Sequence, residues 1–181
     1  MLKPLDIVIM LAAHLHGLRE DAWTYASLSG GLGVSSSQVH GALKRGELAG
    51  LWSATFRRVR ALIFVEFAAH GIPHLVPQRP GASVRGVPTA ASWPSLRDRL
   101  SAGPAYVWPD ARGPLIGAAV EPLDWRVPIM VRQDPALHEA LAMIDALRIG
   151  RARERAFARE LLTVRLVGPP IAQEQWLAAE P

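Results

Sequence analysis

The sequence predicts an α+β protein that is mostly α-helical, with a helix-turn-helix near the N-terminus and a small α+β extension at the C-terminal end. Apolar residues recur at spacings of three and four in several segments, which is the pattern of amphipathic helices. The 15 prolines and 15 glycines predict a loop-rich middle with short strands. Apolar residues make up 50% of the 181-residue chain, enough to bury a sizeable core.

The first helix is predicted over residues 4–16. Pro4 suits the first turn of a helix, where its missing N–H costs nothing. Gly17 is expected to end the helix, and its apolar face to pack on the segment that follows. The residues that share this face are Leu5, Val8, Ile9, Ala12 and Leu15.

Two short amphipathic helices separated by a tight turn are predicted next, over residues 25–32 and 35–48. Gly33 begins the turn, and Ser35 or Ser36 can cap the second helix. A short helix, a turn holding glycine and a helix with a polar, basic outer face form a helix-turn-helix. The expected inward-facing residues are Leu28, Leu32, Val39, Ala42 and Leu43.

The segment resembles the helix-turn-helix of bacterial winged-helix transcriptional regulators of the MarR-like kind. The resemblance covers about 50 residues, from 2 to 51. The chain departs from the pattern at Gly41 and Gly46, where a recognition helix usually has larger residues. Each glycine inside a helix costs roughly 0.5–1 kcal/mol against alanine. The matching residues are Leu32, Gly33, Val34, Ser35, Val39, Leu43, Lys44, Arg45, Ala49, Gly50 and Leu51.

This resemblance implies a sequence-specific DNA-binding transcriptional regulator with residues 35–48 in the major groove. Serine and glutamine bond base edges or phosphates, and lysine and arginine bind phosphate or guanine. The alternative is a solvated helix face in a module used only for protein contact. The candidate DNA contacts on this helix are Ser36, Ser37, Gln38, His40, Lys44 and Arg45.

A basic wing is expected to accompany the recognition helix. Residues 52–60 show no clear hairpin turn, so Arg57 and Arg58 either touch phosphates from a loop or form a solvated rim. A hairpin is predicted over residues 72–87, because Pro-Gly at its centre is a strong turn signal. Its Arg79 and Arg85 would then make a displaced wing that reaches the DNA backbone or minor groove.

The C-terminal part combines short strands with two helices. A short helix over 95–100 and strands over 106–109 and 115–120, joined by a turn at 110–113, are predicted. Trp108 and Trp125 are expected to anchor a small core, although a pocket between them stays open as an alternative.

Asp134 followed by proline predicts the start of a helix that ends or kinks at Gly150, and residues 151–166 predict another. Arginines recur there at helical spacing, either as a solvated face or as a docking surface for a protein partner. This row comprises Arg148, Arg151, Arg155 and Arg159.

The expected organisation is a winged helix-turn-helix domain over 1–88, an α+β region over 95–166 for dimerisation, partner binding or effector sensing, and a tail over 167–181. Residues 1–100 carry 11 Lys and Arg against 6 Asp and Glu, whereas residues 101–181 carry 9 against 10. The basic excess in the first part supports double-stranded DNA as partner. We also expect a homodimer. An antitoxin-like partner of a neighbouring gene product is the alternative function.

Several function classes are disfavoured. The chain has no cysteine, which excludes disulfides and thiolate metal sites and fits a cytoplasmic location. No membrane span, signal peptide, phosphate-binding glycine loop, metal-binding helix or nucleophile elbow is found. We therefore expect no enzyme activity, no cofactor and no metal.

Overall fold

The computed structural model describes residues 1–19, 23–98 and 103–167, and the predicted tail lies almost wholly outside them. In this part of the chain the protein is α+β and mostly helical, which confirms the predicted fold class at this level. None of the described helices is long and apolar enough to cross a membrane.

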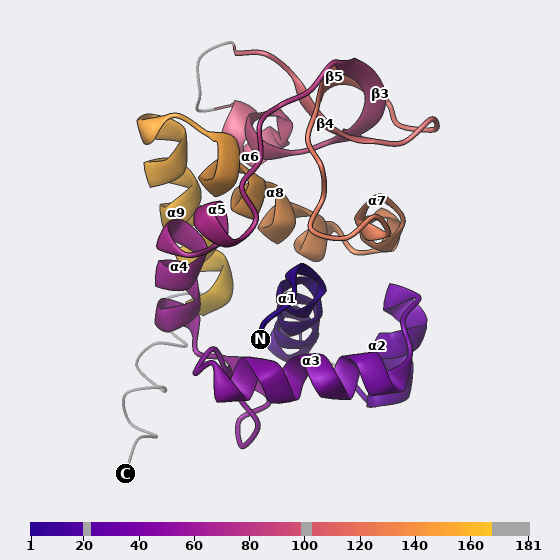
Figure 1. Ribbon diagram of the computed structural model, residues 1–181, viewed down its shortest axis with the longest axis vertical. Coiled ribbons are helices and arrows are strands. Elements are labelled where there is room, and N and C mark those ends of the chain that lie inside the picture. The colour runs from indigo at the N-terminus through magenta and orange to yellow at the C-terminus, as the bar shows by residue number, and fades with distance from the viewer. Residues whose placement is uncertain (20–22, 99–102, 168–181) are drawn as a thin grey trace.

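Helix α1 (Pro4–Leu18) runs through the centre of the molecule (Figure 1). Every residue from 6 to 15 is buried, so the helix is covered on all sides rather than on the single apolar face that its sequence predicts. Helix α3 (Ser36–Leu48) packs on one side of it and α8 (Pro135–Ile149) on another. A helix buried all round needs such cover from separate parts of the chain.

Local capping explains why α2 (Tyr25–Leu32) and α3 form where the sequence predicts them. Gly33 ends α2 with a left-handed φ of 60°, a conformation that favours glycine. Ser35 then caps α3, because its Oγ accepts from the backbone N–H of Gln38 at 3.1 Å. The Gln38 side chain returns a bond to the N–H of Ser35 at 2.9 Å, which completes a capping box.

A small antiparallel hairpin follows α3 directly. Strands β1 (Trp52–Ser53) and β2 (Arg58–Val59) pair with Trp52 opposite Val59. Its tip spans residues 54–57, and Arg57 there has a positive φ of 51°. Tight turns usually place glycine or asparagine at such a position, so the sequence does not predict this turn. The expectation of no clear hairpin at this position was wrong.

The hairpin predicted over residues 72–87 is not formed. After α4 (Ala61–His70), residues 72–75 form a single helical turn, α5 (Ile72–Leu75), with Pro73 in its first turn. Ile72 is fully buried and anchors this turn in the core. Proline is unfavourable inside a strand but favourable in the first turn of a helix, and Pro73 accordingly begins a helical turn rather than a strand.

The remaining strands close into a three-stranded barrel. Strand β3 (Ser83–Pro88) runs antiparallel to both β4 (Tyr106–Pro109) and β5 (Leu115–Ala119), so β4 and β5 are parallel. The two predicted strands therefore exist, but the turn at 110–113 does not join them as a hairpin. A Cβ on Gly86 would lie 2.1 Å from the Trp108 carbonyl oxygen, so the barrel closes only around glycine there.

Short helices lead from the barrel into the helical core. These are the 3₁₀ turn η1 (Ala90–Ser92), α6 (Pro94–Arg97), α7 (Val127–Met130) and the 3₁₀ turn η2 (Val131–Gln133). Asp134 caps α8 as predicted, since its Oδ1 accepts from the N–H of Leu137 at 3.1 Å.

Helix α9 (Ala152–Val167), the last helix among the described residues, packs against α4 and α8 and so covers part of the N-terminal region. Glu66 of α4 pairs with Arg159 of α9. One hydrophobic cluster includes residues from both of the predicted domains, and the proposed division at residue 88 stays a prediction.

A buried polar network joins the barrel to α8. Asp145 accepts bonds from Thr89 Oγ1 at 2.9 Å, Trp108 Nε1 at 2.6 Å and Arg148 Nη1 at 2.6 Å. Arg148 is only 8% exposed, so the predicted row of four arginines on one surface is wrong. Trp108 is buried as predicted, whereas Trp125 is 75% exposed and is not a core anchor.

His14 joins α1 to α9 in the core. Its Nε2 lies 2.8 Å from the carbonyl oxygen of Leu166 and must donate, because a carbonyl only accepts. Burial lowers the pKa of His14 to about 4, although the bond to Leu166 opposes this shift. The folded protein therefore holds this imidazole neutral.

Replacing Gly86 with alanine is expected to lower the free energy of unfolding by about 2 kcal/mol or more, because the new Cβ meets backbone that cannot move aside. Gly30→Ala is the control, since nothing lies within 4 Å of its Cβ position in α2. Helix propensity should make this control more stable by about 0.5–1 kcal/mol. Urea denaturation measures both, and equal stabilities would contradict the barrel packing.

Acid should destabilise the protein through His14. In the unfolded chain the imidazole of His14 binds a proton near pH 6.5, whereas in the folded chain it does so only near pH 4. The free energy of unfolding therefore falls as the pH drops through this window. The expected slope is about 1.4 kcal/mol per pH unit, to which His138 adds in the same direction because burial also lowers its pKa.

His14→Gln keeps a donor for Leu166 but removes the titration, so its stability should change less between pH 6.5 and pH 4 than that of the wild type. His16→Gln is the matched control, because His16 is partly exposed. Urea denaturation at several pH values across this window measures the free energy of unfolding of the wild type and both variants. Identical pH slopes for the wild type and His14→Gln would contradict the assignment.

Candidate nucleic-acid interface

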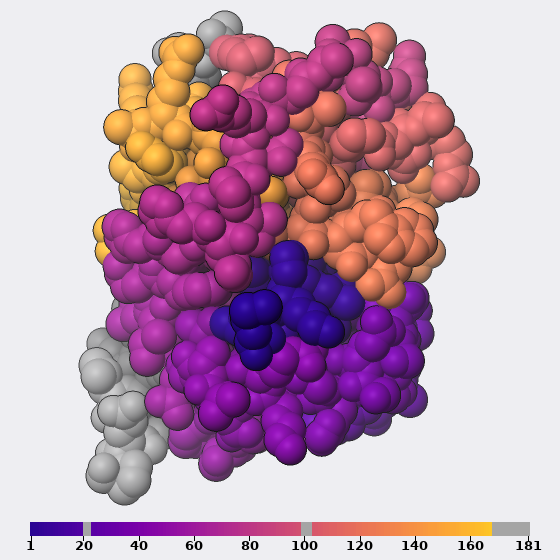
Figure 2. All heavy atoms as spheres, viewed as in Figure 1, coloured from indigo at the N-terminus to yellow at the C-terminus, as the bar shows by residue number. Residues whose placement is uncertain are grey.

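The outer face of α3 is polar and exposed, while its inner face lies against α1. Figure 2 shows α2, α3 and the hairpin forming the lower surface of the molecule. The structure brings five of the predicted contact residues to this outer side. They are Ser36, Ser37, Gln38, His40 and Lys44.

Arg45 does not belong to this outer face. Its Nε and Nη2 bind the two carboxylate oxygens of Asp6 at 2.8 and 2.7 Å, and Asp6 is only 1% exposed. This bidentate ion pair holds α3 against α1. It also raises the pKa of Arg45, first through the hydrogen bonds to Asp6. The outer-face position that helical spacing predicts for Arg45 is therefore not observed, and a contact between Arg45 and DNA stays a prediction.

Gly46 lies on the same inner face and explains one departure from the family pattern. A Cβ at this position would lie 2.3 Å from Sδ of Met10, which is itself fully buried in α1. The glycine therefore allows the two helices to approach closely, at the cost of helix propensity.

Some of the exposed residues already have local partners. Gln38 contributes its side-chain oxygen to the capping box, which leaves its NH₂ group as a donor. Ser36 lies 3.2 Å from Ser29 between their hydroxyl oxygens. The rings of His40 and Tyr25 are 5.8 Å apart, so the start of α2 borders the outer face of α3.

The β1–β2 hairpin lies beside α3 (Figure 1), and its residues include cationic and aromatic side chains. The guanidinium of Arg57 stacks over the ring of Trp23 at 4.0 Å and donates to the Trp23 carbonyl oxygen at 2.8 Å. Arg58 lies over Phe56 at 4.8 Å, and Phe56 is 60% exposed. Arg57 thus fixes the hairpin on the N-terminus of α2.

Arg79 and Arg85 are separated from this surface. Arg85 lies in β3, which Figure 1 shows at the opposite end of the molecule from α3. Its Nη1 donates to the carbonyl oxygen of Gly113 at 3.1 Å, inside the barrel region. Arg79 is exposed on the segment that leads from α5 into β3. The structure does not bring these two arginines together with α3.

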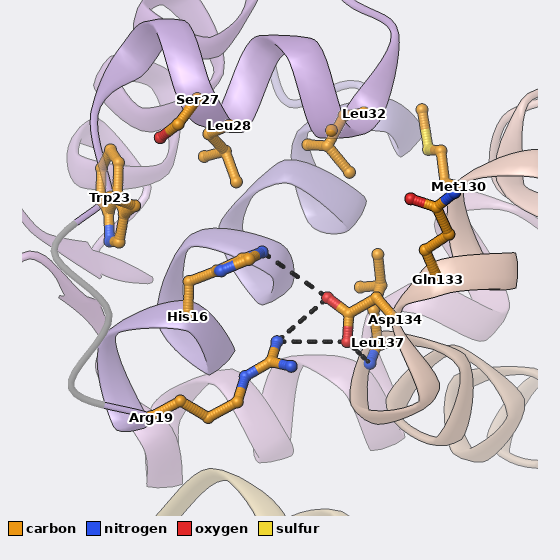
Figure 3. A pocket seen from close by; sticks show the side chains of 11 residues that line it. His16, Arg19, Trp23, Ser27, Leu28, Leu32, Met130, Gln133, Asp134 and Leu137 are labelled. Carbon is orange, nitrogen blue, oxygen red and sulfur yellow. Dashed lines mark hydrogen bonds and ion pairs between the residues drawn. The ribbon is translucent and has the colours of Figure 1, made fainter.

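A cavity of about 360 Å³ lies behind α2, between the end of α1 and the start of α8 (Figure 3). Arg19 donates to both carboxylate oxygens of Asp134 at 3.1 Å, and Nε2 of His16 is 3.7 Å from Asp134. Leu28 and Leu32 of α2 form its apolar side. The sequence predicted Asp134 only as a cap, because its partner Arg19 is far away along the chain.

No family model, no curated protein and no solved structure matches this chain. The function must therefore be argued from the chain itself. Among the described residues, no group of three or more histidines, aspartates or glutamates is placed to hold a metal ion. The sequence singled out the polar face of α3, and the structure adds the adjoining β1–β2 hairpin, which the sequence did not predict.

Arg45→Met should lower the free energy of unfolding by roughly 3 kcal/mol, because the buried carboxylate of Asp6 loses its cation. Lys44→Met is the matched control: it removes the neighbouring charge from an exposed position and should change stability by less than about 0.5 kcal/mol. Thermal and urea denaturation measure both variants. Equal effects would show that the Asp6 pair does not support α3.

Proposed function

We propose that the protein is a sequence-specific DNA-binding transcriptional regulator of the winged helix-turn-helix type, with α3 as its recognition helix. The observation that carries the proposal is the common exposure of the polar side of α3 and of the β1–β2 hairpin on one surface. A recognition helix needs one face in the core and the other free for the major groove. The hairpin takes the place of the wing.

The residues on this surface suit the two kinds of DNA contact. The side chains of Ser37 and His40 lie on the outer side of α3 and can form hydrogen bonds with base edges. The amide group of Gln38 can donate there too. Lys44 and Arg60 are exposed and suit phosphate. Arg57 and Arg58 add positive charge at the hairpin.

Two copies are expected to bind together, since regulators of this type read paired half-sites about one helical turn apart. A cytoplasmic location accompanies the proposal.

A second candidate is a protein-interaction module, for example an antitoxin-like partner of a neighbouring gene product. It is favoured by exposed aliphatic side chains on two helices that pack together: Leu62 and Ile63 on α4 are 66% and 51% exposed, and Val164 on α9 is 60% exposed. Isolated apolar groups on a surface are common, whereas a cluster marks an interaction surface. The two functions are compatible.

The test is binding of the full chain to labelled genomic fragments, beginning with the promoter of its own gene, at about 50 and 200 mM salt. We expect a sequence-selective complex that weakens with salt. Lys44→Ala should weaken binding to all fragments and reduce the salt dependence by about one phosphate contact. Ser37→Ala together with His40→Ala should instead reduce the preference between fragments.

Arg45 is retained in every DNA-binding variant, because its loss would disturb the packing of α3 on α1. Arg153→Ala provides the control for charge, since Arg153 is exposed on α9. No complex at either salt concentration, or equal affinity for Lys44→Ala and Arg153→Ala, would reject α3 as a recognition helix. Co-purification of a neighbouring gene product would then favour the second candidate.

A further inference from the structure

A larger cavity, of about 570 Å³, opens beside the barrel. Residues from β3, α6, the 110–114 turn, η2 and α8 surround it. Its volume is in the range of small-molecule sites in proteins, roughly 300–1,000 Å³. None of the residues proposed to contact DNA lines it.

One wall of this cavity is aromatic. Trp93 and His138 have ring centroids 3.9 Å apart, and buried Trp108 lies behind His138 at 5.2 Å. His138 donates from Nε2 to the carbonyl oxygen of Pro88 at 2.8 Å, so its Nδ1 remains an acceptor. Burial lowers the pKa of His138, which keeps the ring neutral. The wall is thus built of aromatic rings tilted by 43° and carries no charge.

The rim of the cavity is cationic. Arg97 comes from α6, Arg112 from the turn after β4, and Arg132 from η2, so three separate elements supply guanidinium groups. Asp110 accepts from the backbone N–H of Arg112 at 2.9 Å, which leaves the Arg112 side chain out of this contact, and it fixes the guanidinium of Arg132, because it accepts from Nη2 at 2.5 Å. These bonds, in that order, lower the pKa of Asp110, so its charge persists at neutral pH.

We propose that this cavity binds a mononucleotide. The arginines would take the phosphate, because a guanidinium offers paired donors that match phosphate oxygens. The base would lie against the Trp93–His138 wall, since aromatic side chains stack on any base. The carboxylate of Asp110 remains as an acceptor for a sugar hydroxyl or an amino group on the ligand.

One short segment, residues 130–138, lies between this cavity and the cavity behind α2 and contributes side chains to both. Arg132 and His138 face the nucleotide cavity, whereas Met130, Asp134 and Leu137, which alternate with them, line the other cavity behind α2 (Figure 3).

Just before this segment, Nη1 of Arg126 lies 3.4 Å from the carbonyl oxygen of Gly33, in the turn between α2 and α3. A ligand that shifts η2 therefore shifts groups that contact α2. This regulatory part rests on the proposed DNA binding; the nucleotide site itself does not.

The site is tested by calorimetric titration of the full chain with ATP, AMP, inorganic phosphate and adenosine. We expect saturable binding of ATP or AMP, and weaker or no binding of phosphate and adenosine, because each of these lacks half of the recognised groups. Arg112→Gln should weaken nucleotide binding about tenfold or more through loss of a charged hydrogen bond. The backbone bond from residue 112 to Asp110 is kept in this variant.

Arg153→Gln is the matched control, with the same loss of charge at an exposed position on α9. It should bind nucleotide within about twofold of the wild type, as changes away from a binding site generally do. Lack of saturable nucleotide binding, equal weakening by the two variants, or phosphate binding as tightly as AMP would each overturn the proposal.

The regulatory link is tested by repeating the DNA titration with the bound nucleotide at saturation. A change in DNA affinity of about threefold or more supports it, and by reciprocity DNA must then change nucleotide affinity by the same factor. Unchanged DNA affinity would overturn the link. Absence of DNA binding with nucleotide binding intact would reject the proposed function and leave the nucleotide site standing.

Discussion

The complete burial of α1 is the constraint on which the rest of the structure depends. A helix with no exposed side between residues 6 and 15 cannot be covered by the helix-turn-helix alone. Helix α8, from the other end of the chain, supplies the missing surface. The two buried polar groups of this helix bind different helices: Asp6 pairs with Arg45 of α3, and Nε2 of His14 donates to the Leu166 carbonyl oxygen of α9. Both halves of the chain therefore share one core.

Elements that are fixed by local chemistry could be predicted from the sequence. The turn at Gly33, the serine cap of α3 and the Asp134 cap of α8 depend on atoms within a few residues, and each formed where it was expected. The β1–β2 hairpin was missed because Arg57 adopts a positive φ without the usual turn residues. The barrel was missed because the order of strand pairing depends on contacts between distant segments.

The candidate site shows the same division. Helical spacing correctly gave the exposed residues of α3, since spacing alone decides which side chains share a face. It could not show that Arg45, at the edge of that face, meets a carboxylate 39 positions earlier. The cations of the chain look alike in sequence, yet Arg148 is buried on Asp145, Arg45 is half-buried against Asp6, and Lys44 stays exposed. A buried acid elsewhere in the chain decides which cations remain available.

These placements put the proposed DNA surface and the proposed ligand cavity at opposite ends of the molecule. Helix α3, the proposed recognition helix, is fixed to α1 by the Asp6–Arg45 pair, and the cavity proposed for a nucleotide is fixed to α8 by the Asp145 network behind Trp108. Rigid packing between α1 and α8 would by itself transmit little, because a well-packed core has few alternative arrangements. The segment from Met130 to Asp134 is different: it is a short 3₁₀ connection with ion pairs on both sides, Arg132 to Asp110 and Asp134 to Arg19. The arginines of both pairs are partly exposed, so under the proposed ligand binding this connection is where a bound anion would alter the contacts of α2 without disturbing the core.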